Sequence, residues 1–294
     1  MPPILLLIGL LVGSQSPSPT VGVVDAPAIH RWLADVGVES RRLSGEQLSA
    51  ASLQGLTLVV VPLSAVRTQA AAEALADFAA QKGRLLGLYW GVLRREPEPG
   101  RDPLCTLAPA FGIRPIGWRA AAPQPIRIVD PNPGWLPYGG ATASLASPMT
   151  AVVVPLEGAV VLARWGAAED AAPAAVLRGA CLYLPAHLLL PRNADRPETR
   201  DLFFWALQRL EPRVGRPALA RERLRVTAEL VDLAEDAVDK QPDKHHLLAR
   251  VEDARLNLLM GRAHSQPGEW DIALRAADRA RLLATQVLEL TRPE

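Results

Sequence analysis

The pattern of hydrophobic and polar positions changes character once along this chain, near residue 212. Before that point, short apolar runs alternate with amphipathic segments of helical period. The run Leu58–Pro62 is continuous and β-branched, as expected for a strand buried on both faces of a parallel sheet. The segment 68–81 is rich in alanine and carries its apolar residues on one side. This alternation predicts an α/β fold over residues 20–212, with a doubly wound, mostly parallel sheet and right-handed crossovers.

The same pattern predicts individual elements. Strands are expected at 21–24, 38–43, 58–62, 85–88, 126–129, 151–154, 160–165, 175–178 and 181–185. Helices are expected at 28–36, 68–81 and 198–210. Residues 94–148 are rich in proline and glycine and give few periodic stretches, so this part of the domain is the least defined by sequence.

The remaining sequence consists of helix formers. Residues 212–217, Pro-Arg-Val-Gly-Arg-Pro, have the composition of a linker. Beyond it, apolar stripes predict three helices at 218–240, 244–264 and 268–290, with a proline in each of the two short turns between them. Short turns place consecutive helices antiparallel, so residues 217–294 are expected to form a small three-helix bundle or coiled-coil hairpin.

The N-terminal region carries an apolar run of its own at Ile4–Val12, followed by a Ser/Pro-rich stretch. The run has the length of a signal-peptide core and falls short of the ~20 residues that a membrane span requires. We therefore predict that residues 1–19 are a signal peptide and linker, that the protein is exported to a periplasmic or extracellular location, and that it has no transmembrane span. No Lys or Arg precedes the run, so a buried first strand of a cytoplasmic protein stays open as the alternative.

Charge and cysteine content exclude several classes of function. Lys plus Arg number 32 and Asp plus Glu number 31, so the chain has no overall field that would gather nucleic acid. The two cysteines, Cys105 and Cys181, leave disulfide formation open, although the apolar surroundings of Cys181 favour a buried thiol. No cysteine–histidine spacing of a zinc site is present, and we expect no metal and no cofactor.

The segment Gly83–Gly91 is the most informative motif. It reads as a buried strand that runs into a tight turn, in which Gly87 and Gly91 leave space on either side of Tyr89. Enzymes with a strand-to-helix elbow present a nucleophile at such a position, where the backbone is strained. A phenol with a pKa near 10 is a poor nucleophile without strong activation.

Together with the order of elements, the Gly87–Gly91 turn resembles the class I glutamine amidotransferase-like fold over residues 20–212. The closing block Arg178–His187 is the second motif of the resemblance. Within that group the chain looks most like the non-catalytic branch, found in the trimerisation domain of bacterial β-galactosidases and in trehalose-utilisation-like proteins. Catalytic members use Cys in the elbow and an H-x-E arrangement after the last strand, whereas this chain has Tyr89, His187 and Leu189 at these positions. The resemblance therefore implies that glutaminase activity is absent and that the protein is not an enzyme of that class.

A ligand-binding site is predicted where Tyr89 and His187 meet at the carboxyl ends of the strands, the usual ligand position in open α/β sheets. Asp25 ends the first strand and is expected near the same rim. Three tryptophans are candidate stacking platforms in this crevice: Trp90, Trp118 and Trp135. The competing interpretation is a crevice filled by its own side chains.

Three functions fit these features. The first is an exported, non-catalytic protein that binds a ligand or assembles, with a carbohydrate or protein partner, a link to cell-envelope processes and self-association as options. The second is a carbohydrate-active hydrolase that uses Asp25, Tyr89 and His187 as acid–base groups, which requires all three within reach of one substrate position. The third makes the helical bundle an interaction module supported by the α/β part.

Overall fold

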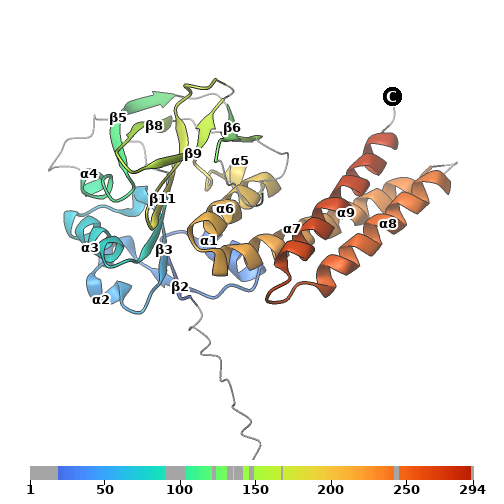
Figure 1. Ribbon diagram of the computed structural model, residues 1–294, viewed down its shortest axis with the longest axis horizontal. Coiled ribbons are helices and arrows are strands. Elements are labelled where there is room, and N and C mark those ends of the chain that lie inside the picture. The colour runs from blue at the N-terminus through green and yellow to red at the C-terminus, as the bar shows by residue number, and fades with distance from the viewer. Residues whose placement is uncertain are drawn as a thin grey trace, which may run out of the picture.

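The computed structural model describes residues 19–89, 103–120, 124–130, 135, 142–145, 149–166, 168–241 and 245–292. An α/β body carries a bundle of long helices on one side (Figure 1). The strands are β1 (Val21–Val24), β2 (Ser40–Leu43), β3 (Leu58–Pro62), β4 (Arg84–Leu88), β5 (Ile113–Ala120), β6 (Gln124–Ile128), β7 (Thr142–Leu145), β8 (Met149–Pro155), β9 (Val160–Trp165), β10 (Pro173–Arg178) and β11 (Cys181–Leu184). The α-helices are α1 (Pro27–Asp35), α2 (Ala50–Leu53), α3 (Gln69–Ala80), α4 (Pro103–Leu107), α5 (Pro191–Ala194), α6 (Pro197–Leu210), α7 (Pro212–Asp239), α8 (His245–Ala263) and α9 (Trp270–Leu290).

The main sheet has nine strands in the order β2-β1-β3-β4-β11-β10-β9-β6-β7. The five strands from β2 to β11 pair in parallel. The remaining pairs, from β11–β10 to β6–β7, are antiparallel. A separate two-stranded antiparallel sheet joins β5 to β8. The predicted doubly wound α/β class is confirmed, and the antiparallel strands extend its sheet on one side.

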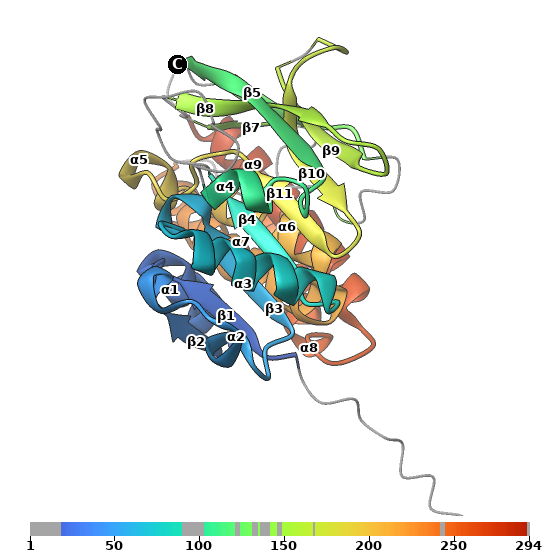
Figure 2. The ribbon, with the colours of Figure 1, turned by 90° about the vertical axis from the view of Figure 1, so that its left-hand side faces the viewer.

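Helices cover both faces of the parallel strands. Alternate side chains of β1, β3 and β4, such as Val23 and Val60, point into a core shared with α1, α6 and the part of the helical bundle that adjoins the α/β body. Their neighbours, such as Val24 and Val61, enter a second core with α3, α4 and Phe111. Figure 2 shows α3 on one side of β3 and β4, with α6 and α7 on the other. Because β3 is buried on both faces, its continuous β-branched sequence is the pattern that this position requires.

The stretch predicted as a linker, residues 212–217, is instead the beginning of α7, so this expectation was wrong. Pro212 takes the first helical position, where its missing N–H costs nothing, and the side chain of Glu211 caps the helix by accepting from the Arg213 N–H at 3.1 Å. Gly215 allows α7 to cross the end of α6 closely, because a Cβ there would lie 2.1 Å from the backbone N of Gln208. Proline and glycine thus serve helix initiation and close packing here.

The bundle is joined to the α/β body by buried ion pairs. Arg223 on α7 is 1% exposed and pairs with Asp201 on α6 and Asp278 on α9, each at 3.0 Å. Fully buried Glu222 also binds Arg200 of α6, at 2.8 Å. These contacts tie three helices together at a point where the apolar core of the body continues into the bundle. Farther out, α7, α8 and α9 share a smaller core of their own.

Helices α8 and α9 lie within two residues of their predicted bounds, whereas α7 begins six residues before the predicted start at 218. Among the helices of the described residues, none has both the length and the apolar character that crossing a membrane requires.

Candidate functional site

Tyr89 follows β4 directly and has the strained backbone expected of an elbow. Its φ is +27°, which residues with a side chain rarely adopt, and its N–H donates to the Leu184 carbonyl at 3.0 Å. Gly87 serves the core in a way that the sequence did not indicate, because a Cβ there would lie 2.6 Å from the ring of Phe111. The strand and the strained residue of the predicted elbow are therefore present at Tyr89, whereas the turn that should follow, with Gly91, lies outside the described residues.

His187 and Tyr89 lie together as predicted, and their rings are stacked. The ring centroids are 3.8 Å apart and the planes differ by 29°. Tyr89 is 7% exposed and His187 is partly buried. Asn193, completely buried at the end of the following short helix, holds the loop by donating to the His187 carbonyl at 2.8 Å. The two side chains therefore occupy the carboxyl end of β4 and β11 by packing against each other.

Burial keeps both rings neutral. It lowers the pKa of His187 to about 4 and raises the pKa of Tyr89 above its usual value. The Nδ1 of His187 is buried and has no hydrogen-bond partner among the described residues, so no carboxylate orients this ring through that atom. A general base needs a pKa near the working pH, and a nucleophile needs an activated oxygen or sulfur. The pair meets neither condition.

Asp25 lies away from the pair. Its carboxylate accepts the Gly45 N–H at 2.8 Å, and its own φ is +41°. Strand β1, which Asp25 follows, is separated from β4 by β3, so the two strands are about 10 Å apart. Asp25 therefore closes a turn between β1 and the segment after β2, and the structure does not bring it to Tyr89 and His187 as one acid–base group.

Of the three candidate tryptophans, the structure describes the side chain of Trp135. Trp90 and the side chain of Trp118 lie outside the described residues. Trp135, a candidate stacking platform in the crevice, packs against the main core, and its Nε1 donates to Asp271 of α9 at 3.1 Å. Trp135 is thus a contact to the helical bundle.

The other candidate groups for chemistry are the two cysteines and the possible metal ligands. Cys105 and Cys181 are thiols and form no disulfide, and burial raises the pKa of Cys181 to about 11, which makes it a poor nucleophile. Within the described ranges, no three His, Cys, Asp or Glu side chains gather into a group that could hold a metal ion.

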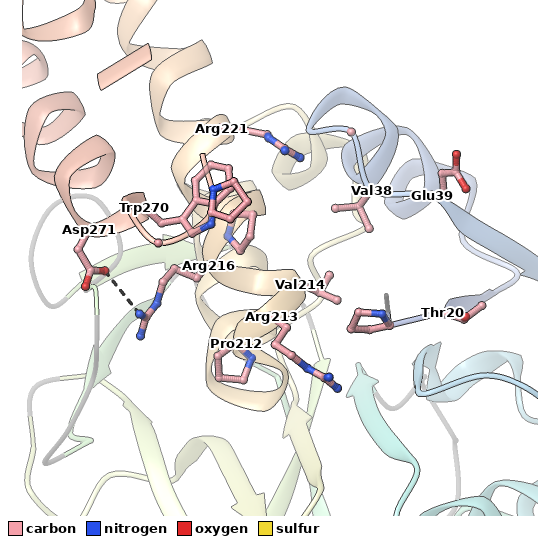
Figure 3. Close-up of a pocket in the computed structure, with 15 residues that line it drawn as sticks. Thr20, Val38, Glu39, Pro212, Arg213, Val214, Arg216, Arg221, Trp270 and Asp271 are labelled. Carbon is pink, nitrogen blue, oxygen red and sulfur yellow. Dashed lines mark ion pairs between the residues drawn. The ribbon is translucent and has the colours of Figure 1, made fainter. Parts of the chain in front are cut away.

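A second site, absent from the sequence predictions, lies between the α/β body and the bundle. It is a groove of about 920 Å³ formed by the start of α7, the turn before α9 and the segments at residues 19–20 and 37–39. Figure 3 shows Arg213, Arg216 and Arg221 of α7 along it, with Trp270 of α9 between them and Glu39 on the opposite side. Its lining comes from four separate parts of the sequence, which explains why no local motif marked it.

No protein-family model matches the chain, and no curated protein is similar to it in sequence. Similar solved structures include a cold-adapted β-galactosidase from Rahnella sp. R3, with 20% identity over 65% of this chain and a TM-score of 0.48. A ThuA-like protein from Bacteroides uniformis has 12% identity over 68% of this chain, 95% of its own length and a TM-score of 0.43. A glutamine amidotransferase from Thermotoga maritima has 12% identity over 66% of this chain, 99% of its own length and a TM-score of 0.43.

Two of these neighbours, the ThuA-like protein and the glutamine amidotransferase, have the names of groups that the sequence resembles. The chain covers 31% of the β-galactosidase, so only a part of that enzyme corresponds to it. At these identities and scores, the likeness is one of fold alone.

Proposed function

We propose that this protein is a non-catalytic member of the amidotransferase-like fold group, which acts by binding and self-association. The stacking of Tyr89 on His187 carries the proposal. The elbow position holds a buried phenol, its neighbour is a neutral imidazole, and Leu189 packs toward the core where a catalytic glutamate would be needed. The separation of Asp25 from this pair counts against the hydrolase alternative.

The absence of catalysis can be tested directly. Purified protein is incubated with glutamine and with chromogenic glycosides, and ammonia or the coloured product is measured. We expect neither to be released above the level of a heat-denatured sample. Turnover that disappears in both Tyr89→Phe and His187→Gln would overturn the proposal.

The outer surface of α8 supports self-association. Its inward residues, among them Val251 and Leu258, are buried in the bundle. On the opposite side lie Leu256, Leu259 and Met260, which are 64%, 58% and 44% exposed. Residues three and four apart on a helix share one face, so these three form a continuous apolar stripe, here termed the α8 stripe. A stripe of this kind on the solvent side of a helix is typical of a docking surface.

The charges around the α8 stripe suit a second copy of the same chain. Glu252 and Asp253 precede it by one turn and Arg262 follows it, all with exposed side chains. In an antiparallel, two-fold pairing of α8 with its copy, Leu256 faces the Leu259 of the other copy. The acidic end then meets the Arg262 of that copy. A two-fold interface must be self-complementary in this way.

Sedimentation velocity over a range of protein concentrations tests the pairing. We expect dimers that dissociate in Leu256→Glu, because the substitution buries a charge at the centre of the stripe. Leu233→Glu is the matched control, since Leu233 is an exposed leucine on α7, 57% exposed, outside the stripe. A parent protein that is monomeric at all concentrations, or a dimer that Leu256→Glu leaves intact, would refute self-association through α8.

Export is the part of the proposal that rests on the apolar run Ile4–Val12 and the Ser/Pro-rich stretch after it. Expression of the full chain in a bacterium, followed by fractionation and intact-mass measurement, tests it. Cleavage between residues 12 and 19 in the exported fraction is the expected result, and uncleaved protein confined to the cytoplasm would contradict it.

A further inference from the structure

The groove between the α/β body and the bundle is lined by the first turns of α7, which contribute Arg213, Arg216 and Arg221. In Figure 3 Arg216 extends toward Asp271, Arg213 extends to the other side of the helix, and Arg221 lies beside Trp270 of α9. At 1.5 Å per residue, Arg213 and Arg221 are separated by about 12 Å along the helix. The groove therefore offers guanidinium groups at both ends and an aromatic ring between them.

The arginines are oriented by the protein. The guanidinium of Arg221 lies 5.2 Å from the ring centroid of Trp270 and donates to the Val36 carbonyl at 2.8 Å. Arg216 has one weak pairing, 3.8 Å from Asp271, and its side chain is 46% exposed. Five N–H donors per guanidinium exceed these contacts, so donors remain available to an incoming oxyanion.

The neighbouring charges also favour an anion. Helix α9 begins at the groove without a side-chain cap among the described residues, which places the positive end of its dipole there, whereas the start of α7 is already capped by the Glu211 carboxylate. Two carboxylates oppose this positive charge: Glu39 on the far side of the groove and Asp271, which is held by Trp135 and Arg216. Among the lining residues, three arginines face two carboxylates. Arg213 is also paired with buried Glu211 at 3.2 Å, so the charge that stays available to an anion is mainly that of Arg216 and Arg221.

We propose that this groove binds an elongated organic anion that carries carboxylate or phosphate groups at both ends and a ring between them. The terminal oxyanions pair with Arg213 and Arg216 at one end and with Arg221 at the other, and the ring contacts Trp270. A volume of about 920 Å³ accommodates a molecule of two or three linked rings. This site is separate from the α8 stripe and does not depend on self-association.

Isothermal titration calorimetry with three probes tests the inference. Trigalacturonate carries a carboxylate on each ring, fructose 1,6-bisphosphate carries a phosphate at each end, and maltotriose has rings without charge. We expect at least one of the two anions to bind, with an affinity that falls as NaCl is raised, and maltotriose not to bind. Which anion binds distinguishes a carboxylate ligand from a phosphate ligand.

Reversing the charge of Arg216 tests whether the anion binds in the groove. We expect Arg216→Glu to weaken binding of the anion by about tenfold or more, as for loss of a charge-assisted hydrogen bond. Arg279→Glu, an equal charge change at an exposed position of α9 outside the groove, is the matched control and should change the affinity less than about twofold. Arg213→Gln, at a side chain that is 53% exposed, gives a second variant if Arg216→Glu melts at a lower temperature than the parent.

Three results would overturn the inference. They are no binding of either anion, equal binding of maltotriose, and an equal loss of affinity in Arg279→Glu and in the groove variants.

Discussion

Replacing Arg223 by methionine tests how the bundle is fastened to the α/β body. In the parent, Nε and Nη2 of Arg223 lie 3.0 and 3.3 Å from the two oxygens of Asp201, and Nη1 lies 3.0 Å from both oxygens of Asp278. Methionine fills much of the same space and removes the charge. Two carboxylates are then left facing each other at the α6–α7–α9 junction.

The stability lost in Arg223→Met depends on how deeply the carboxylates of Asp201 and Asp278 are buried. Asp201 is fully buried, whereas the side chain of Asp278 is 37% exposed and can recover contact with water. Most of the loss therefore comes from the buried carboxylate of Asp201, which loses the charge of Arg223; removing one partner of a buried ion pair typically costs about 3–5 kcal/mol. We expect Arg223→Met to lower the free energy of unfolding by that amount at pH 7.

The loss should depend on pH in a defined direction. Burial already raises the pKa of Asp278, and Arg223 opposes that rise. Without Arg223 the folded-state pKa of Asp278 increases further, so the folded variant prefers this carboxyl group protonated. The stability difference from the parent should therefore be largest near neutral pH and should shrink as the pH falls toward 5.

Urea unfolding, followed by circular dichroism and tryptophan fluorescence at pH 7 and pH 5, measures both effects. The double variant Asp201→Leu/Arg223→Met is the control, because apolar replacement of a buried pair is often neutral, and it should recover most of the loss. A decrease below about 1 kcal/mol in Arg223→Met, or no recovery in the double variant, would refute the reasoning.

Three further outcomes are expected. Gly215→Ala should lower the free energy of unfolding by more than about 3 kcal/mol, because its Cβ would meet the backbone of Gln208. Helix propensity alone predicts that the same substitution raises stability by about 1 kcal/mol, so the sign of the change in melting temperature decides between the two effects. Gly87→Ala should cost about 1–3 kcal/mol through its contact with Phe111, and an unchanged urea midpoint would contradict that. Burial lowers the pKa of His187 to about 4, so the folded protein resists protonation of this ring; its contribution to the free energy of unfolding, up to about 3 kcal/mol, is present above pH 6.5 and lost as the pH falls toward 4. NMR titration of the imidazole checks the pKa, and His187→Phe should flatten this part of the dependence of stability on pH.

The helices and strands that could be predicted from sequence are those in which each face keeps the same surroundings, core or solvent, along its whole length. Strand β9 begins and ends where its alternation indicates, and β3 shows the run expected for burial on both faces. Strand β5 was missed because Pro115 and Gly117 interrupt its pattern, and its pairing with β8 shifts register between those two residues. Short elements such as β7 and α5 have too few residues to show a period.

The Tyr89–His187 contact and the groove also differ in how far the sequence predicts them. The contact of Tyr89 with His187 could be predicted, because parallel strands end at one edge of the sheet and each residue follows such a strand. The role of Gly215 could not, since a glycine that permits helix contact and a glycine in a linker have the same local sequence. The groove depends on how α7 and α9 pack beside residues 37–39, which is a long-range property of the fold.

The unbroken start of α7 also sets a length. The helix has 28 residues and rises about 39 Å from the groove at Arg213 to the outer end of the bundle at Asp239. A Gly/Ser-rich linker would let that separation fluctuate, with an end-to-end distance that grows only as the square root of its length. Here the separation is fixed by a helix whose first turns are packed against α6 and fastened by Arg223. The helix thus fixes the distance between the groove and the outer end of the bundle.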